Sequence, residues 1–206
     1  MCFSASASFA ASGALAVAGG ASLAIATPRQ RLLAVVPLVF AAQQAFEGVQ
    51  WLALNSGTTC QSVGRTYLLL ALALWPTYLP IAVYLLDERR RRLHRWLIGI
   101  GAAVSMYLLV MLMLLPLEIV VINQSIRYLL PVPFSFPATI MYVLATCGSL
   151  LSSSLRYVQL LGVLLLLTGG VSLVLFATTA LSVWCFFAAV VSVSIGIALY
   201  AHRRAR

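Results

Sequence analysis

One apolar stretch of the chain carries a row of polar side chains that could do chemistry. It holds an amide, a carboxyl, a second amide and an indole at Gln43, Glu47, Gln50 and Trp51. On an α-helix this spacing places all four on one face, with Gln44 on the neighbouring face. A carboxyl among amides and an indole can bind a small polar solute or a cation, or accept and release a proton.

Glu47 has two interpretations, both of which require it to face the protein interior, because lipid cannot satisfy its hydrogen bonds. In the first, Glu47 is protonated or hydrogen-bonded by the glutamines and only locks helices together. In the second, it is the centre of a ligand or proton site. For that site we expect six ligand-binding residues and no metal ion: Glu47, Gln43, Gln44, Trp51, Tyr78 and Arg127.

Arg127, in the connector before the fifth apolar run, is one of two arginines on the side of the chain that carries few positive charges, so we expect a local partner to hold it. An ion pair with Glu118 or with Glu47 would neutralise both charges near a membrane. The alternative is that the Arg127 side chain extends to water with its charge unpaired. The sequence leaves both open.

The elements that must position these residues are membrane-spanning helices. The chain is 63% hydrophobic and 8% charged, too few charges to cover the surface of a soluble domain. Its apolar residues fall into runs of about 20, the length that crosses a bilayer as a helix. We predict an all-α integral membrane protein, a single domain over 1–206, with spans at 6–26, 32–55, 66–86, 96–116, 136–153, 157–177 and 181–201.

Arginine placement predicts the orientation, because positive charge is retained on the cytoplasmic side. Of the 13 arginines, a seven-span chain places 11 on one side, and only Arg65 and Arg127 on the other. We therefore expect an outside N-terminus and a cytoplasmic C-terminus in a bacterial inner membrane. Glu47 then lies ~20 Å from the cytoplasmic end of its span, in the outer half.

The basic run Arg89–Arg92 predicts contact with anionic lipid head groups on the cytoplasmic side. The net charge of +9 would suggest a nucleic-acid partner in a soluble protein, but these arginines flank apolar runs, so no nucleic acid is expected. A homo-oligomer or a larger membrane complex remains open.

Three of the four cysteines fall on the outer side, where thiols tend to be oxidised: Cys2, Cys60 and Cys185. Three cysteines allow three single bridges, and the sequence does not choose among them. The candidates we carry forward are Cys2 and Cys185, whose bridge would tie the N-terminal tail to the last span. Cys147 is interpreted as a small buried apolar residue.

Several cofactor chemistries are not expected. The chain has no lysine, which removes a retinal Schiff base. His94 and His202 both lie at cytoplasmic span ends beside arginines, so we expect no histidine-ligated haem or zinc. No GxSxG, HExxH, Walker or CxxC pattern occurs, and an enzyme is therefore the less favoured class.

Three short segments are similar to a known group of proteins. They are Met1 to Ser8 (MCFSASAS), Gln43 to Trp51 (QQAFEGVQW) and Ser182 to Cys185 (SVWC). They resemble a family of uncharacterised bacterial multi-spanning membrane proteins that begin Met-Cys-aromatic-Ser. The resemblance implies no activity, but it adds weight to the residues that stand in these motifs: Cys2, Ser4, Gln44, Glu47, Trp51, Trp184 and Cys185.

Three function hypotheses follow. The leading one is an outward-opening polar pocket around Glu47 that binds a small polar solute or cation for transport or sensing. The second is an accessory or assembly subunit of a larger membrane complex. The third is a membrane-embedded enzyme that uses Glu47 as acid or base and an outer cysteine, such as Cys2, as nucleophile or metal ligand.

Overall fold

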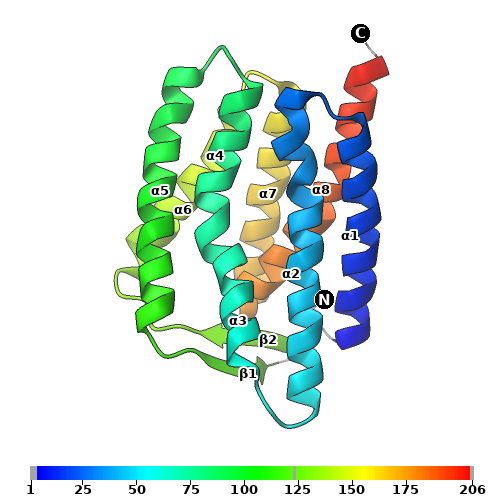
Figure 1. The fold of residues 1–206 in the computed structure, drawn as a ribbon. Coiled ribbons are helices and arrows are strands. Elements are labelled where there is room, and N and C mark those ends of the chain that lie inside the picture. The colour runs from blue at the N-terminus through cyan, green and yellow to red at the C-terminus, as the bar shows by residue number, and fades with distance from the viewer. Residues whose placement is uncertain (1–3, 123, 205–206) are drawn as a thin grey trace.

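The computed structural model describes residues 4–122 and 124–204, which form a bundle of helices with a β-hairpin across one end (Figure 1). The helices are α1 (Ala5–Ile25), α2 (Arg31–Asn55), α3 (Gln61–Leu68), α4 (Trp75–Leu86), α5 (Arg91–Leu114), α6 (Ser135–Leu151), α7 (Arg156–Leu175) and α8 (Ala180–Arg204). Three shorter helical segments join them: η1 (Pro28–Gln30), η2 (Leu69–Leu74) and η3 (Ala177–Thr179). Because η2 continues α3 into α4, the described chain forms seven helical rods.

Six of these rods are long and apolar enough to cross a membrane. The seventh, α6, is apolar but has only 17 residues. Helices occupy all seven ranges that the apolar runs predict. The largest differences are at the starts of α3 and α5, which each begin five residues before the predicted position, at Gln61 and Arg91.

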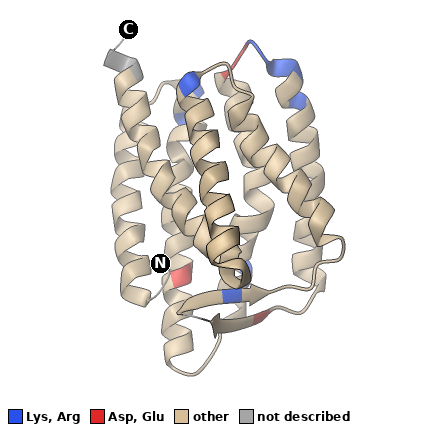
Figure 2. Cartoon of the chain, turned by 180° about the vertical axis from the view of Figure 1, so that it is seen from behind, with Lys and Arg blue, Asp and Glu red and all other residues tan. Residues whose placement is uncertain are grey.

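The two ends of the bundle differ in charge. We call the end with the links 26–30, 87–90 and 152–155 the arginine end, and the opposite end, with the β-hairpin and the link 56–60, the hairpin end. Figure 2 shows most basic residues gathered at the arginine end. Arg65, at the hairpin end, donates hydrogen bonds to the carbonyl oxygens of Leu112 and Leu115, which closes the C-terminus of α5.

The β-hairpin is a feature that the sequence analysis missed. β1 (Glu118–Ile122) pairs antiparallel with β2 (Ser125–Leu129), with Ile119 opposite Tyr128. Ile119 and Ile126 are buried, and the Tyr128 ring stacks on Tyr67 of α3 with 4.7 Å between ring centroids. The predicted connector is therefore an ordered cover over the hairpin end of the bundle.

The α3–η2–α4 rod contains a π-helical turn at η2. Pro76, which follows it, has no N–H to donate to the carbonyl of Leu72, so the regular helical bonding cannot continue there. The Tyr142 hydroxyl of α6 donates to the carbonyl oxygen of Ala71 at 2.7 Å. α5 packs closely against this rod at Pro76. A Cβ at Gly101 of α5 would overlap the Pro76 carbonyl oxygen, so only a glycine fits there without a shift.

Candidate functional site

Glu47 lies inside the bundle in the half of α2 nearer the hairpin end, fully buried. Its Oε1 accepts a hydrogen bond from the Ser182 hydroxyl at 2.7 Å, and its Oε2 accepts one from Gln44 Nε2 at 3.2 Å. Ser182 stands in the first turn of α8, so the carboxyl joins α2 to α8. This agrees with the expectation that the polar face of α2 looks into the protein.

Gln43 and Gln50, the glutamines of this helix face, are also fully buried, but their side-chain polar atoms lack hydrogen-bond partners in the described part of the chain. Neither Nε2 nor Oε1 of Gln43 or of Gln50 has a hydrogen-bond partner among the described residues, and the same is true of Trp51 Nε1. A buried polar group without a partner costs about 1 to 3 kcal/mol. Side chains that bear this cost next to a buried carboxyl are typical of a site that takes up polar atoms from outside the chain.

A thiol completes this polar cluster. Cys185, one turn after Ser182 on α8, is buried and lies beside Gln43, Tyr67 and Glu47. Among the described residues, Cys60, Cys147 and Cys185 form no disulfide with one another. Cys2, the other half of the expected bridge to Cys185, lies outside the described residues, so that bridge stays a prediction.

Two expected members of the site lie elsewhere. The Tyr78 hydroxyl donates to the Leu32 carbonyl oxygen at 2.7 Å. Leu32 is 15 residues before Glu47 on the same helix, roughly 22 Å along its axis at 1.5 Å per residue, so the structure does not bring Tyr78 to Glu47. Arg127 lies on β2, and it forms no ion pair with Glu47 or Glu118, both of which are described.

Arg127 instead lines a polar cavity of about 250 Å³ at the hairpin end. The walls are Ile126 to Leu130 and Ala177 to Ser182, and so include Ser182, whose hydroxyl binds Glu47. The cavity therefore reaches the side of the Glu47 cluster that faces the hairpin end. Sequence reasoning gave Ser182 no role, because its contact with Glu47 joins residues 135 positions apart.

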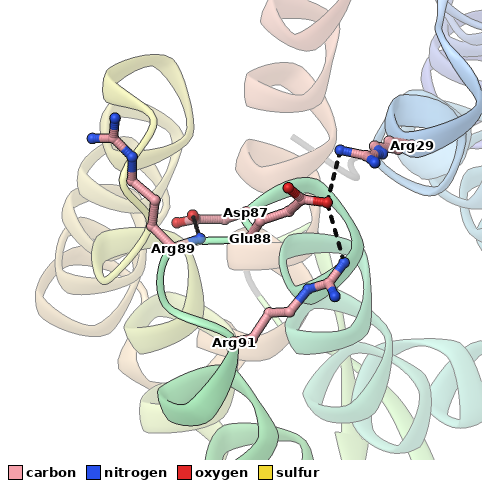
Figure 3. A network of polar contacts seen from close by, with 5 residues as sticks. All are labelled: Arg29, Asp87, Glu88, Arg89 and Arg91. Carbon is pink, nitrogen blue, oxygen red and sulfur yellow. Dashed lines mark hydrogen bonds and ion pairs between the residues drawn. The ribbon is translucent and has the colours of Figure 1, made fainter.

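A second polar network holds the arginine end together (Figure 3). Asp87, 3% exposed, accepts hydrogen bonds from the backbone N–H of Arg89 at 3.0 Å, the backbone N–H of Ser154 and the Ser153 hydroxyl at 3.3 Å. Burial raises the pKa of Asp87, but the hydrogen bonds from Ser154 and Arg89 outweigh it, so the net pKa lies below the usual value. The carboxyl thus ties the α4–α5 link to the α6–α7 link.

The neighbouring Glu88 makes only exposed contacts. Its Oε1 lies 2.9 Å from Nη1 of Arg29 and 3.4 Å from Nη2 of Arg91 (Figure 3). Arg89 and Arg92 are exposed at the same end, and their contact with anionic lipid stays a prediction.

His94 differs from the expectation of a histidine among surface arginines. It does lie at the arginine end, but it is fully buried, and its Nε2 is 3.3 Å from the Ser152 hydroxyl. The side chain of His202 is outside the part of the chain that the structure describes. Within that part, no group of three or more His, Cys, Asp or Glu side chains lies close enough to hold a metal ion.

Comparison with known proteins gives one result. No curated protein and no solved structure is significantly similar to the chain. One family, whose function is not established, does match the chain, in line with the resemblance seen in the sequence. The bacterial source and the shared N-terminal motif stay expectations. The match covers residues 1–206, and the chain therefore belongs to the family of unknown function DUF6629.

Proposed function

We propose that the chain crosses a bacterial cytoplasmic membrane seven times, with the hairpin end outside and the arginine end in the cytoplasm. Six helices of sufficient length and hydropathy support this, together with the gathering of arginines at one end. The 17 residues of α6 are at the lower limit of what can span. An even number of spans would place both termini on one side and break the alternation of the arginine-rich links at one end of the chain.

We further propose that the Glu47 cluster binds a small polar solute or cation that arrives from the hairpin end, for transport or sensing. The observation that carries this proposal is the pair of fully buried glutamines whose four side-chain polar atoms have no partner among the described residues. They flank a carboxyl, and a polar cavity reaches the serine that holds that carboxyl. If Glu47 only held α2 against α8, its hydrogen bond with Ser182 would be sufficient, and the two buried glutamines would have no role.

Glu47 supplies the negative charge of this site, and the amides of Gln43 and Gln50 supply both donors and acceptors. A ligand with hydroxyl, amine or amide groups, or a partly dehydrated cation, can use such a mixed set. Buried contacts of this kind discriminate strongly between ligands, because a ligand that lacks a matching group leaves the amides unpaired again. We therefore expect a selective site.

The test is a thermal-shift screen of the purified protein against small polar solutes and monovalent and divalent cations. A ligand present at 100 times its Kd stabilises a protein by about 2.7 kcal/mol, enough to be detected. The Glu47→Gln variant keeps the shape and removes the charge, so it should lose the response. Glu88→Gln is the matched control, because Glu88 is exposed at the other end. An equal response of wild type and Glu47→Gln would refute the proposal and leave Glu47 a structural lock.

A further inference from the structure

Two cavities of opposite character adjoin each other at the hairpin end. The larger has a volume of about 620 Å³ and apolar walls from α5, α6, α7 and α8, among them Leu108, Ala138, Leu173 and Trp184. The smaller is the polar cavity of about 250 Å³ that Arg127 lines. We call them the apolar chamber and the polar chamber. Both are lined by Leu130, Ala180 and Leu181, so they lie side by side.

The apolar chamber is open to the surroundings of the bundle. Leu166 and Leu173 of α7 line it and are 45% and 64% exposed. Gly169 and Gly170 also line it, and a Cβ at Gly170 would meet no atom within 4 Å. A molecule that moves in the lipid phase can therefore enter the chamber beside α7.

The polar chamber carries a positive charge that no acid of the described chain neutralises. Arg127 makes no ion pair with any described aspartate or glutamate. The opposite wall presents the hydroxyl-bearing residues Thr178, Thr179 and Ser182. An arginine with hydroxyl groups around it is suited to a phosphate or carboxylate.

We propose that the two chambers together bind one membrane lipid with an anionic head group, its acyl chain in the apolar chamber and its head group at Arg127. The inference rests on the proposed membrane location but not on ligand binding at Glu47. A lipid is the occupant that fits, because the apolar chamber faces the hydrocarbon phase and the charge lies at its outer end. Such a lipid would also border Ser182, and so occupy the approach to Glu47.

The experiment uses the full-length protein purified in mild detergent and incubated with either phosphatidylglycerol or phosphatidylcholine of identical acyl chains. Native mass spectrometry then counts the lipids that each chain retains. Wild type should retain one phosphatidylglycerol with roughly fivefold preference over phosphatidylcholine, the factor that one arginine contributes near an anionic head group. Equal retention of the two lipids would overturn the proposed head-group contact.

Two pairs of variants separate the chambers. Arg127→Gln should abolish the preference for the anionic lipid, whereas Arg31→Gln, at an exposed position of the arginine end outside the Arg89–Arg92 run, should not. Gly170→Leu should lower retention of both lipids roughly fifteenfold, because each methylene that loses its burial weakens binding about fourfold and two would be displaced. Gly99→Leu is its control, since a Cβ at Gly99 would also meet no atom within 4 Å and Gly99 lies outside the chamber.

The outcomes distinguish this inference from the proposed function. Retention that is unchanged in both Arg127→Gln and Gly170→Leu overturns the lipid site. If Gly170→Leu does not fold, as judged by circular dichroism, Leu173→Trp fills the same chamber from a position that is 64% exposed. Glu47→Gln should retain the lipid like wild type, so loss of solute binding in that variant with normal lipid retention would separate the two sites.

Discussion

Asp87→Asn should weaken the arginine end of the bundle by about 2 kcal/mol. The wild-type carboxylate uses one oxygen for the Arg89 N–H and the other for the Ser154 N–H and the Ser153 hydroxyl. An asparagine offers only one oxygen, so at least one buried donor loses its acceptor, at a cost of about 1 to 3 kcal/mol. The remaining bonds also lose the strength that the negative charge gives them.

The assay is thermal unfolding of the purified protein. For a chain of this size, 1 kcal/mol shifts the Tm by about 2 to 4 °C, so Asp87→Asn should lower it by roughly 4 to 8 °C. The control is the adjacent Glu88→Gln, whose ion pairs with Arg29 and Arg91 are exposed. Exposed pairs contribute about 0 to 1 kcal/mol, and the control should shift the Tm by no more than a few degrees.

The same network gives a pH dependence with a definite sign. The pKa of Asp87 in the folded protein lies below its usual value, so the carboxylate stabilises the fold fully above the unfolded pKa of about 3.9. This contribution is lost as the pH falls through the lower, folded pKa. The Tm difference between wild type and Asp87→Asn should therefore shrink as the pH falls below ~4.

Two results would refute this reasoning. A Tm of Asp87→Asn within the range of Glu88→Gln would mean that the buried network adds no more than an exposed ion pair. A Tm difference that stays the same as the pH falls from 5 to 2 would mean that the Asp87 carboxylate does not stabilise the fold.

Two further predictions use simpler readouts. Iodoacetamide should label Cys60 on the intact protein and reach the buried Cys147 only after denaturation. Hydrogen bonds from the Ser62 hydroxyl and the Val63 backbone lower the Cys60 pKa, so Ser62→Ala should shift the labelling of Cys60 to higher pH. Equal labelling rates in Ser62→Ala and wild type would contradict this. Gly101→Ala should lower the Tm measurably, because its Cβ would overlap the Pro76 carbonyl oxygen, whereas Gly99→Ala should be neutral or slightly stabilising.

The helices could be predicted from the sequence because each one is an apolar run with polar residues at its ends. The inward position of Gln43, Glu47 and Gln50 could also be predicted, since their helical spacing puts them on a single face. Both predictions depend only on local sequence, which sets hydropathy and periodicity.

Contacts between segments far apart in the chain could not be predicted from local sequence. Ser182 meets Glu47 only because α8 packs against α2, and no local pattern encodes that pairing. The hairpin was missed because β1 reads as part of an apolar connector, although the β-branched residues around Val120 are typical of strands. Tyr78 lies further from the hairpin end than expected, because the α3–η2–α4 rod that carries it begins at Gln61 rather than five residues later.

The most direct test of the account is an experimental density map of the protein in lipid nanodiscs, examined around Glu47. We predict a carboxyl held by the Ser182 hydroxyl inside the bundle, with non-protein density within hydrogen-bonding distance of the amides of Gln43 and Gln50. A Glu47 side chain that faces acyl chains, or amides that pair with each other and leave no room for a ligand, would contradict the proposed site.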